Sequence, residues 1–317
     1  MKDKNQFQDS DWKQESAGKP KRSVNKDGSF NIKRQGFGYS FKNTYLDLLK
    51  MSWSSFLMLI LLFLMSTNLL FATIYMLIGT DQLSGVVGDS NLDAFIQSFF
   101  FSFQTFTTVG YGSLAPSGNL TSLIASFEAM IGLMSFSIVT GLLYGRFSRP
   151  VAHFQYSKNA LIAPYKDGWS LQFRIANQSK SQVIELEAKV MLIYSDPSTE
   201  SSYQGEYFNL KLESKRLLFF PLNWTLVHAI DKASPLCNLS KEMMSRSNME
   251  LMILIKGYDD TFSQEVNSRY SYVFEEIVWG GKFVRPYFTD SEGYTTIDSN
   301  LIDQYDEVPF DKFESTA

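Results

Sequence analysis

The chain has 317 residues, with 29 Lys and Arg against 33 Asp and Glu, one cysteine and two histidines. This length allows two or three domains. The single cysteine, Cys237, excludes an intrachain disulfide and a Cys-x-x-Cys metal or redox site. Because His153 and His228 lie far apart in the sequence, little remains for a zinc site or a Cys/His catalytic pair.

The formal net charge of −4 is unevenly distributed. Residues 1–50 carry eleven Lys and Arg against six Asp and Glu, residues 51–150 carry two against four, and residues 151–317 carry sixteen against twenty-three. The middle third therefore differs in kind from the two ends. We expect a membrane domain over residues 51–150 between two water-soluble parts.

The first uncharged stretch runs from Met51 to Thr80. A helix needs about 20 residues to cross a hydrocarbon core that is ~30 Å thick, so this stretch predicts a membrane span at about residues 52–79. Trp53 and Tyr75, near its two ends, suit anchoring at the membrane interfaces. A cleaved signal peptide is not expected, because the apolar run is too long and begins far from the start.

A second span is predicted at about residues 120–147, and between Leu120 and Tyr144 its only charge is Glu128. The loop between the spans contains acidic residues but no Lys or Arg, whereas the outer flanks carry Lys42, Lys50, Arg146 and Arg149. This asymmetry predicts that both termini are cytoplasmic. The alternative, a pair of buried helices in a soluble protein, fits neither the span lengths nor the charges well.

The segment between the spans, AFIQSFFFSFQTFTTVGYGSLAPSGN, is uncharged and aromatic. It predicts a short helix at about residues 92–107, with Asp93 in the first turn, where the helix dipole favours an anion. The glycines that follow disfavour continuation of the helix. Because non-helical backbone at membrane depth is tolerated only inside protein or along a watery cavity, a helix, re-entrant loop and helix predict a pore lining.

The run Thr108-Val109-Gly110-Tyr111-Gly112 matches the potassium-channel selectivity filter, whose carbonyl oxygens replace the hydration shell of the ion. Gly110 and Gly112 can adopt positive φ, which lets successive carbonyls face one side. We expect K⁺ at Thr108 to Tyr111, the Thr108 hydroxyl at the inner end, and the side chains of Val109 and Tyr111 pointing outward as braces. A chance match in a turn is the alternative.

One TVGYG strand cannot surround an ion, because the filter needs four copies. A homotetramer with cyclic symmetry is therefore predicted. Glu128 lies about two turns into the second span, near the depth of the filter. We expect it to brace the pore helix, and lining of the ion path is the alternative.

Three residues of the second span, Phe136, Thr140 and Tyr144, share one helical face. If that face lines the pore, Phe136 and Thr140 lie in its cavity and four Tyr144 rings can form an inner gate that closes by dewetting. The alternative is that these aromatic rings pack against the first span or lipid. Gly132 and Gly141 are either hinges or sites of close helix packing.

Beyond Pro150 the pattern changes to period two, as in Trp169–Ile175 and Leu186–Leu192. Many short strands separated by turns predict a β-sandwich over residues 151–300, followed by a tail at 301–317. Residues 36–50 predict an amphipathic helix on the cytoplasmic membrane face, or an extension of the first span. Residues 1–35 are polar, and we expect them to be mobile.

Several pieces, in their order, resemble the prokaryotic inward-rectifier potassium channels (KirBac type) over roughly residues 26–300. They are Asp47-Leu48-Leu49 before Trp53, the TVGYG filter, Gly145-Arg146-Phe147-Ser148-Arg149-Pro150, LQFRIANQSKSQVIELEAKVML, NWTLVHAIDKASPL and IVWGGKFV. The resemblance implies a tetramer with an interfacial slide helix and an immunoglobulin-like cytoplasmic domain that extends the pore. It also implies that Tyr144 is the bundle-crossing aromatic and that Gly132 and Gly141 are bending glycines.

Strong rectification in this family uses an acid in the cavity that traps polyamine or Mg²⁺, and Phe136 occupies that position. Glu206 matches a cytoplasmic-pore acid, whereas Lys256 replaces another. The resemblance therefore implies weak rectification. Block by polyamine, Mg²⁺ or Ba²⁺ is a further expectation.

The basic cluster that serves phosphoinositide activation in animal members is missing after Pro150. We expect sensitivity to anionic lipid headgroups through Lys50, Arg146 and Arg149, without phosphoinositide activation. The carboxylate–arginine pair behind the filter of animal members is replaced by Gln104 and Leu114. Filter support is therefore expected from Gln104 and Glu128.

The sequence thus predicts a potassium-selective channel of the bacterial inner membrane, with no cofactor and no nucleic-acid partner. Voltage gating is disfavoured because two spans leave no room for a sensor helix. A calcium-gated channel would need a nucleotide-binding unit, and no G-x-G-x-x-G follows the second span. An enzyme lacks a catalytic constellation, a ligand-gated channel lacks an outer domain, and a non-conducting scaffold remains an alternative.

Overall fold

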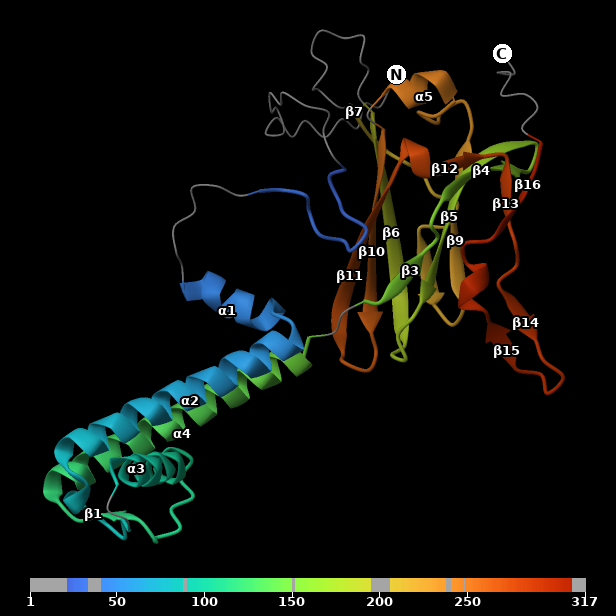
Figure 1. The fold of residues 1–317 in the computed structure, drawn as a ribbon. Coiled ribbons are helices and arrows are strands. Elements are labelled where there is room, and N and C mark those ends of the chain that lie inside the picture. The colour runs from blue at the N-terminus through green and yellow to red at the C-terminus, as the bar shows by residue number, and fades with distance from the viewer. Residues whose placement is uncertain are drawn as a thin grey trace. The chain divides into compact units, whose positions relative to one another are not determined.

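The structure is a computed structural model that describes residues 22–33, 41–87, 90–149, 152–194, 206–237, 241–247 and 249–309. The chain divides into two units, Gly36–Arg149 and a second unit made of Met1–Gln35 with Pro150–Ala317. The described residues of the first unit are mainly helical, and those of the second are mainly β-strands (Figure 1).

The helical unit contains α1 (Phe41–Lys50), α2 (Trp53–Ile78), α3 (Asn91–Phe106) and α4 (Asn119–Phe147). Helices α2 and α4 are each long and apolar enough to cross a membrane. The bounds of α2, α3 and α4 lie within one residue of the predicted spans and short helix. Helix α1 corresponds to the predicted interfacial helix, whose residues 36–40 lie outside the described residues.

Local signals explain where these helices begin and end. The Ser52 hydroxyl accepts a hydrogen bond from the backbone N–H of Ser55 and caps α2, which ends at Gly79 with φ 114°. Helix α3 begins after Ser90, whose hydroxyl accepts from the N–H of Asp93. The short strands β1 (Leu83–Ser84) and β2 (Ala115–Pro116) pair antiparallel. This pairing joins the segment before α3 to the segment after the TVGYG loop.

The β unit contains two five-stranded sheets. One has the order β12-β4-β5-β3 with β9 on β5, and the other has the order β11-β10-β6-β7 with β8 on β6. The first sheet consists of β3 (Phe154–Tyr156), β4 (Ala160–Tyr165), β5 (Gly168–Asn177), β9 (Asn223–Ile230) and β12 (Ile277–Trp279). The second consists of β6 (Val183–Tyr194), β7 (Glu206–Asn209), β8 (Arg216–Phe219), β10 (Glu250–Asp259) and β11 (Gln264–Val273).

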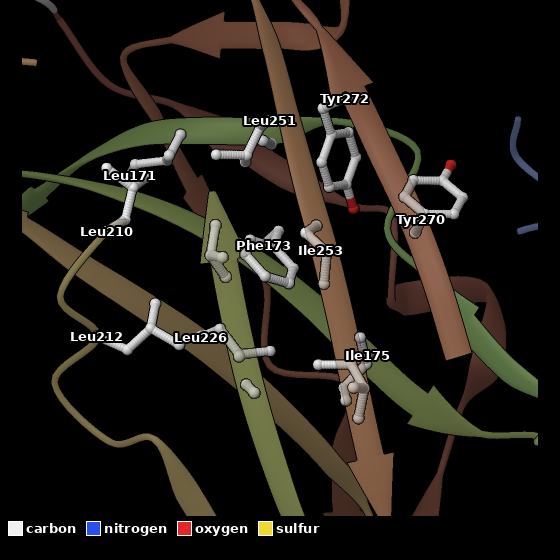
Figure 2. Packing of buried hydrophobic residues seen from close by; sticks show 14 of the residues in the cluster. Leu171, Phe173, Ile175, Leu210, Leu212, Leu226, Leu251, Ile253, Tyr270 and Tyr272 are labelled. Carbon is white, nitrogen blue, oxygen red and sulfur yellow. The ribbon is translucent and has the colours of Figure 1, made fainter. Parts of the chain in front are cut away.

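Apolar side chains from both sheets form a single core (Figure 2). Phe173 of β5 lies close to Ile253 of β10 in Figure 2, and its ring centroid is 5.8 Å from that of Tyr272 on β11. Alternate residues of β6 are buried from Leu186 to Leu192, because successive side chains of a strand point to opposite faces, whereas β5 is buried on both faces over most of its length. The predicted immunoglobulin-like β-sandwich is confirmed.

The β unit continues past residue 300, the predicted end of the sandwich, in a separate two-stranded sheet. Strand β16 (Tyr305–Glu307) pairs antiparallel with β13 (Gly281–Phe283), and Ile302 is fully buried. The remaining short elements are α5 (Lys241–Arg246), β14 (Tyr287–Thr289) and β15 (Thr295–Ile297). Part of the predicted tail therefore belongs to the β unit.

Residues 22–33 lie against the β unit, which differs from the expectation that residues 1–35 are mobile. Val24 is 2% exposed, and the buried carboxylate of Glu250 accepts hydrogen bonds from the N–H groups of Ser23 and Val24 at 2.7–3.2 Å. Arg22 forms an ion pair with Glu276 at 2.5 Å. This polar segment is held because its own Val24 side chain is buried and its backbone N–H groups bind the carboxylate of Glu250.

Candidate functional site

Along the backbone from Thr108 to Gly112, the sign of the φ angle alternates from one residue to the next. Its φ angles are 60° at Thr108, 53° at Gly110 and 82° at Gly112, whereas the residues between them do not have positive φ. Alternating hands turn successive carbonyls toward one side, as a row of ion ligands requires. The positive φ of the two glycines was predicted, and that of Thr108 was not.

Gln104, in the last turn of α3, holds three consecutive amides of this strand. Its backbone carbonyl accepts from the N–H of Val109 at 2.9 Å and of Gly110 at 3.2 Å. Its side-chain Oε1 accepts from the N–H of Tyr111 at 3.2 Å. Leu114, which the resemblance matched to one half of a charged pair, packs on an apolar cluster. An uncharged residue therefore supports the TVGYG strand.

The side chains of the TVGYG strand are open in one chain. Tyr111 is 83% exposed and Val109 is 53% exposed. A Cβ atom added at Gly110 or Gly112 would meet no atom within 4 Å. The expected bracing by Val109 and Tyr111 is thus not provided within one copy of the described residues.

The predicted pore face of α4 is also open. Phe136 is 72% exposed and Tyr144 is 74% exposed, and Thr140 between them is exposed as well. This exposure argues against the alternative that both rings pack against α2 of the same chain. Phe136 and Thr108 help to line one apolar pocket of about 450 Å³ between α2, the end of α3 and α4. The candidate cavity and the inner end of the TVGYG strand therefore adjoin.

Glu128 is fully buried between three helices. Its Oε2 accepts from the Tyr75 hydroxyl at 2.6 Å, and its Oε1 accepts from the Ser102 hydroxyl at 2.5 Å. The Ser102 hydroxyl also lies 3.0 Å from Oδ1 of Asn68. We call these four residues the buried polar cluster. The burial of Glu128 favours the bracing interpretation over lining of an ion path.

Three members of the buried polar cluster correct or extend the sequence analysis. Tyr75, expected to anchor the first span at a membrane interface, is 0% exposed because its hydroxyl reaches Glu128. Ser102 was not singled out, and neither was Asn68. The seven-residue spacing of Asn68 and Tyr75 places both on one face of α2, and this signal was available.

Gly132 and Gly141 differ in their surroundings. A Cβ atom on Gly132 would lie 2.0 Å from the backbone oxygen of Phe106, at the end of α3. Gly141 has no atom within 4 Å of such a position. Gly132 is therefore a site of close helix packing, whereas Gly141 stays free for the hinge role.

Arg146 is engaged within the helical unit. It donates to the carbonyls of Leu48 at 2.5 Å and Met51 at 2.6 Å, near the C-terminus of α1, where a cation is favourable. Its guanidinium lies 4.6 Å from the ring centroid of Trp53. The other two candidate lipid-binding residues, Lys50 and Arg149, are exposed. Arg146 is thus less available to a lipid headgroup than these two.

Comparison with known proteins gives two family matches and many relatives. A model described as "Inward rectifier potassium channel C-terminal domain" matches residues 154–316, and one described as "Ion channel" matches residues 57–149. The inward rectifier potassium channel Kirbac3.1 of Paramagnetospirillum magnetotacticum is 35% identical, over 87% of this chain and 93% of that protein. The chain belongs to the inward rectifier potassium channel family.

More distant members of the inward rectifier family also match. The G protein-activated inward rectifier potassium channel 3 of Homo sapiens is 25% identical, over 91% of this chain and 78% of that protein. Channel 2 of that name from Mus musculus is 25% identical, over 89% and 71%. These relatives are ion channels, which agrees with the expectation that the protein is not an enzyme.

Two residues that the sequence analysis linked to rectification lie in the β unit. Glu206 is the first residue of β7 and is exposed. Lys256, on β10, forms an exposed ion pair with Glu265 at 3.3 Å. Lys256, which stands where the resemblance implies an acid, is thus paired with an acidic residue of β11.

Replacement of Gly132 by alanine is expected to destabilise the helical unit. The added methyl group meets backbone rather than a movable side chain, so α3 and α4 must separate at a cost of about 1–3 kcal/mol. Thermal unfolding in detergent measures this effect. Gly141→Ala is the matched control and is expected to be neutral or to raise stability by up to about 1 kcal/mol. Equal melting temperatures for Gly132→Ala and the wild type would contradict the close-packing role.

Proposed function

We propose that the protein is a homotetrameric, potassium-selective channel whose filter is the strand Thr108 to Gly112. The observation that carries this proposal is the alternation of φ along a strand held by Gln104. Such a strand offers a row of carbonyl oxygens at the spacing of the backbone, which can replace the water around a dehydrated K⁺.

The exposure of the strand's side chains in a single chain supports the proposed tetramer. Tyr111 and Val109 are exposed in one chain although they belong to a membrane segment. Four copies around one axis would complete the ring of carbonyls and cover these side chains. Membership in the inward rectifier family supports the same assembly.

The exposed face of α4 supplies the remaining path. Phe136 and Thr140 would line the cavity below the filter, and four Tyr144 rings would close it by excluding water. Gly141 leaves room for α4 to bend between them. The charges that flank α2 and α4 favour both termini in the cytoplasm. The similarity to Kirbac3.1 of Paramagnetospirillum magnetotacticum supports a bacterial inner membrane as the location.

Uptake of Rb⁺ or K⁺ into liposomes tests conduction, with Na⁺ as the control ion and Ba²⁺ as the blocker. The wild type is expected to take up K⁺ and Rb⁺ but not Na⁺. Gly110→Ala is expected to abolish selective uptake, because an added methyl group disfavours positive φ. Gly168→Ala, at an open position in the β unit, is the matched control. Absence of uptake by the tetrameric wild type would favour a non-conducting scaffold.

Weak rectification is part of the proposal because the cavity position is Phe136. Without a carboxylate there, internal spermine has no strong electrostatic partner in the membrane field. Voltage-step currents with and without internal spermine are expected to show shallow block in the wild type. Phe136→Asp is expected to tighten block by roughly tenfold or more. Deep, voltage-dependent block of the wild type would contradict this part.

Anionic lipid headgroups are proposed to bind Lys50 and Arg149. Flux is expected to depend on the anionic lipid content of the liposome, and added phosphoinositide is expected to give no large rise. The double variant Lys50→Ala with Arg149→Ala should lose most of this dependence. Lys232→Ala, an exposed lysine of the β unit, should keep it. A large rise with phosphoinositide would count against the idea.

A further inference from the structure

A seam of polar side chains runs through the buried contact of α2, α3 and α4. Its members are each at most 1% exposed: Asn68, Tyr75, Ser98, Ser102, Thr121 and Glu128. The buried polar cluster within it joins all three helices through Glu128, which accepts from the hydroxyls of Tyr75 and Ser102 at 2.5–2.6 Å, and Asn68 Oδ1 lies 3.0 Å from the Ser102 hydroxyl. Burial of so many polar groups costs stability unless they are paired, so the arrangement needs a reason beyond packing.

We propose that the buried polar cluster positions α3 and thereby sets the selection of K⁺ over Na⁺. Asn68, Tyr75 and Ser102 are positioning residues in this account, acting with Glu128 behind the filter. The inference rests on the proposed function and adds the residues that determine its specificity.

The buried polar cluster can position α3 because polar contacts restrict the packing of helices more than apolar contacts do. Apolar surfaces between helices are non-directional and let one helix slide against another, whereas a hydrogen bond fixes two atoms within tenths of an ångström. Ser102 contacts Glu128 of α4 and Asn68 of α2 at once. The position of α3 along its axis is therefore fixed relative to both α4 and α2.

The position of α3 directly determines the position of the filter. Gln104 is two residues after Ser102 on the same helix, and it holds the amides of Val109, Gly110 and Tyr111. A shift of Ser102 therefore moves the atoms from which the filter is suspended. Since selection depends on the place and field of the carbonyl oxygens, such a shift is expected to weaken discrimination against Na⁺.

The residues that hold the TVGYG strand carry no charge, since Gln104 binds its amides and Leu114 packs on an apolar cluster. Glu128 supplies a buried carboxylate on the other side of α3, with both oxygens occupied by hydroxyl donors. The brace is thus made to α2 and α4 rather than along the filter loop.

Single-atom deletions test the proposal. Ser102→Ala removes the hydroxyl that serves Glu128 and Asn68, and Tyr75→Phe removes the other donor to Glu128. Ser126→Ala is the matched control, because its exposed hydroxyl bonds only to the carbonyl of Ser122 in its own helix among the described residues. Tetramer content by native mass and the Rb⁺/Na⁺ uptake ratio in liposomes are measured for each.

We expect Ser102→Ala and Tyr75→Phe to assemble as tetramers while their Rb⁺/Na⁺ uptake ratio falls roughly tenfold, as one unsatisfied buried acceptor predicts. The double variant should fall by less than the product of the two single effects, because both act through Glu128. Ser126→Ala should match the wild type.

Unchanged uptake ratios in assembled Ser102→Ala and Tyr75→Phe would overturn the positioning role while leaving the channel function intact. If a variant fails to assemble alone, the Rb⁺/Na⁺ uptake ratio is measured on tetramers in which variant chains are co-assembled with wild-type chains. An unchanged uptake ratio in these mixed tetramers would also overturn the positioning role. A wild type that does not distinguish Rb⁺ from Na⁺ would instead overturn the proposed function.

Discussion

The hydrogen bonds that Gln104 accepts from three consecutive backbone amides are the constraint on which the helical unit depends. A non-glycine residue such as Thr108 in the left-handed region costs about 1–2 kcal/mol. Each hydrogen bond contributes about 0.5–1.5 kcal/mol, so the three together offset that cost. The end of α3 therefore imposes on the strand a conformation that the strand would not keep by itself.

Gln104 holds the strand Thr108 to Gly112 through its backbone amides, and the side chains of the strand are left uncovered in one chain. Val109 and Tyr111 are exposed, and the aromatic face of α4 is exposed with them. In a membrane span, open backbone needs protein or water around it. In the proposed tetramer, four copies around one axis would cover these exposed side chains.

Local patterns in the sequence were sufficient to predict the helices, the TVGYG run and the β-sandwich. Apolar length defines α2 and α4, and the period of two defines strands such as β5 and β6. The buried polar cluster was not predicted as a whole, because Asn68, Ser102 and Glu128 meet only when three helices pack. For the same reason Tyr75 was misplaced at an interface, and the docking of Val24 was missed within a polar segment.

The central claim is that main-chain oxygens of four chains hold dehydrated K⁺ on a shared axis. Anomalous scattering from Rb⁺ in crystals of the protein measures this most directly. The account predicts a row of Rb⁺ peaks on a fourfold axis, between the carbonyls of Thr108 and Tyr111. A tetramer with no peaks along that strand, or a chain that crystallises from lipid without a fourfold axis, would contradict it.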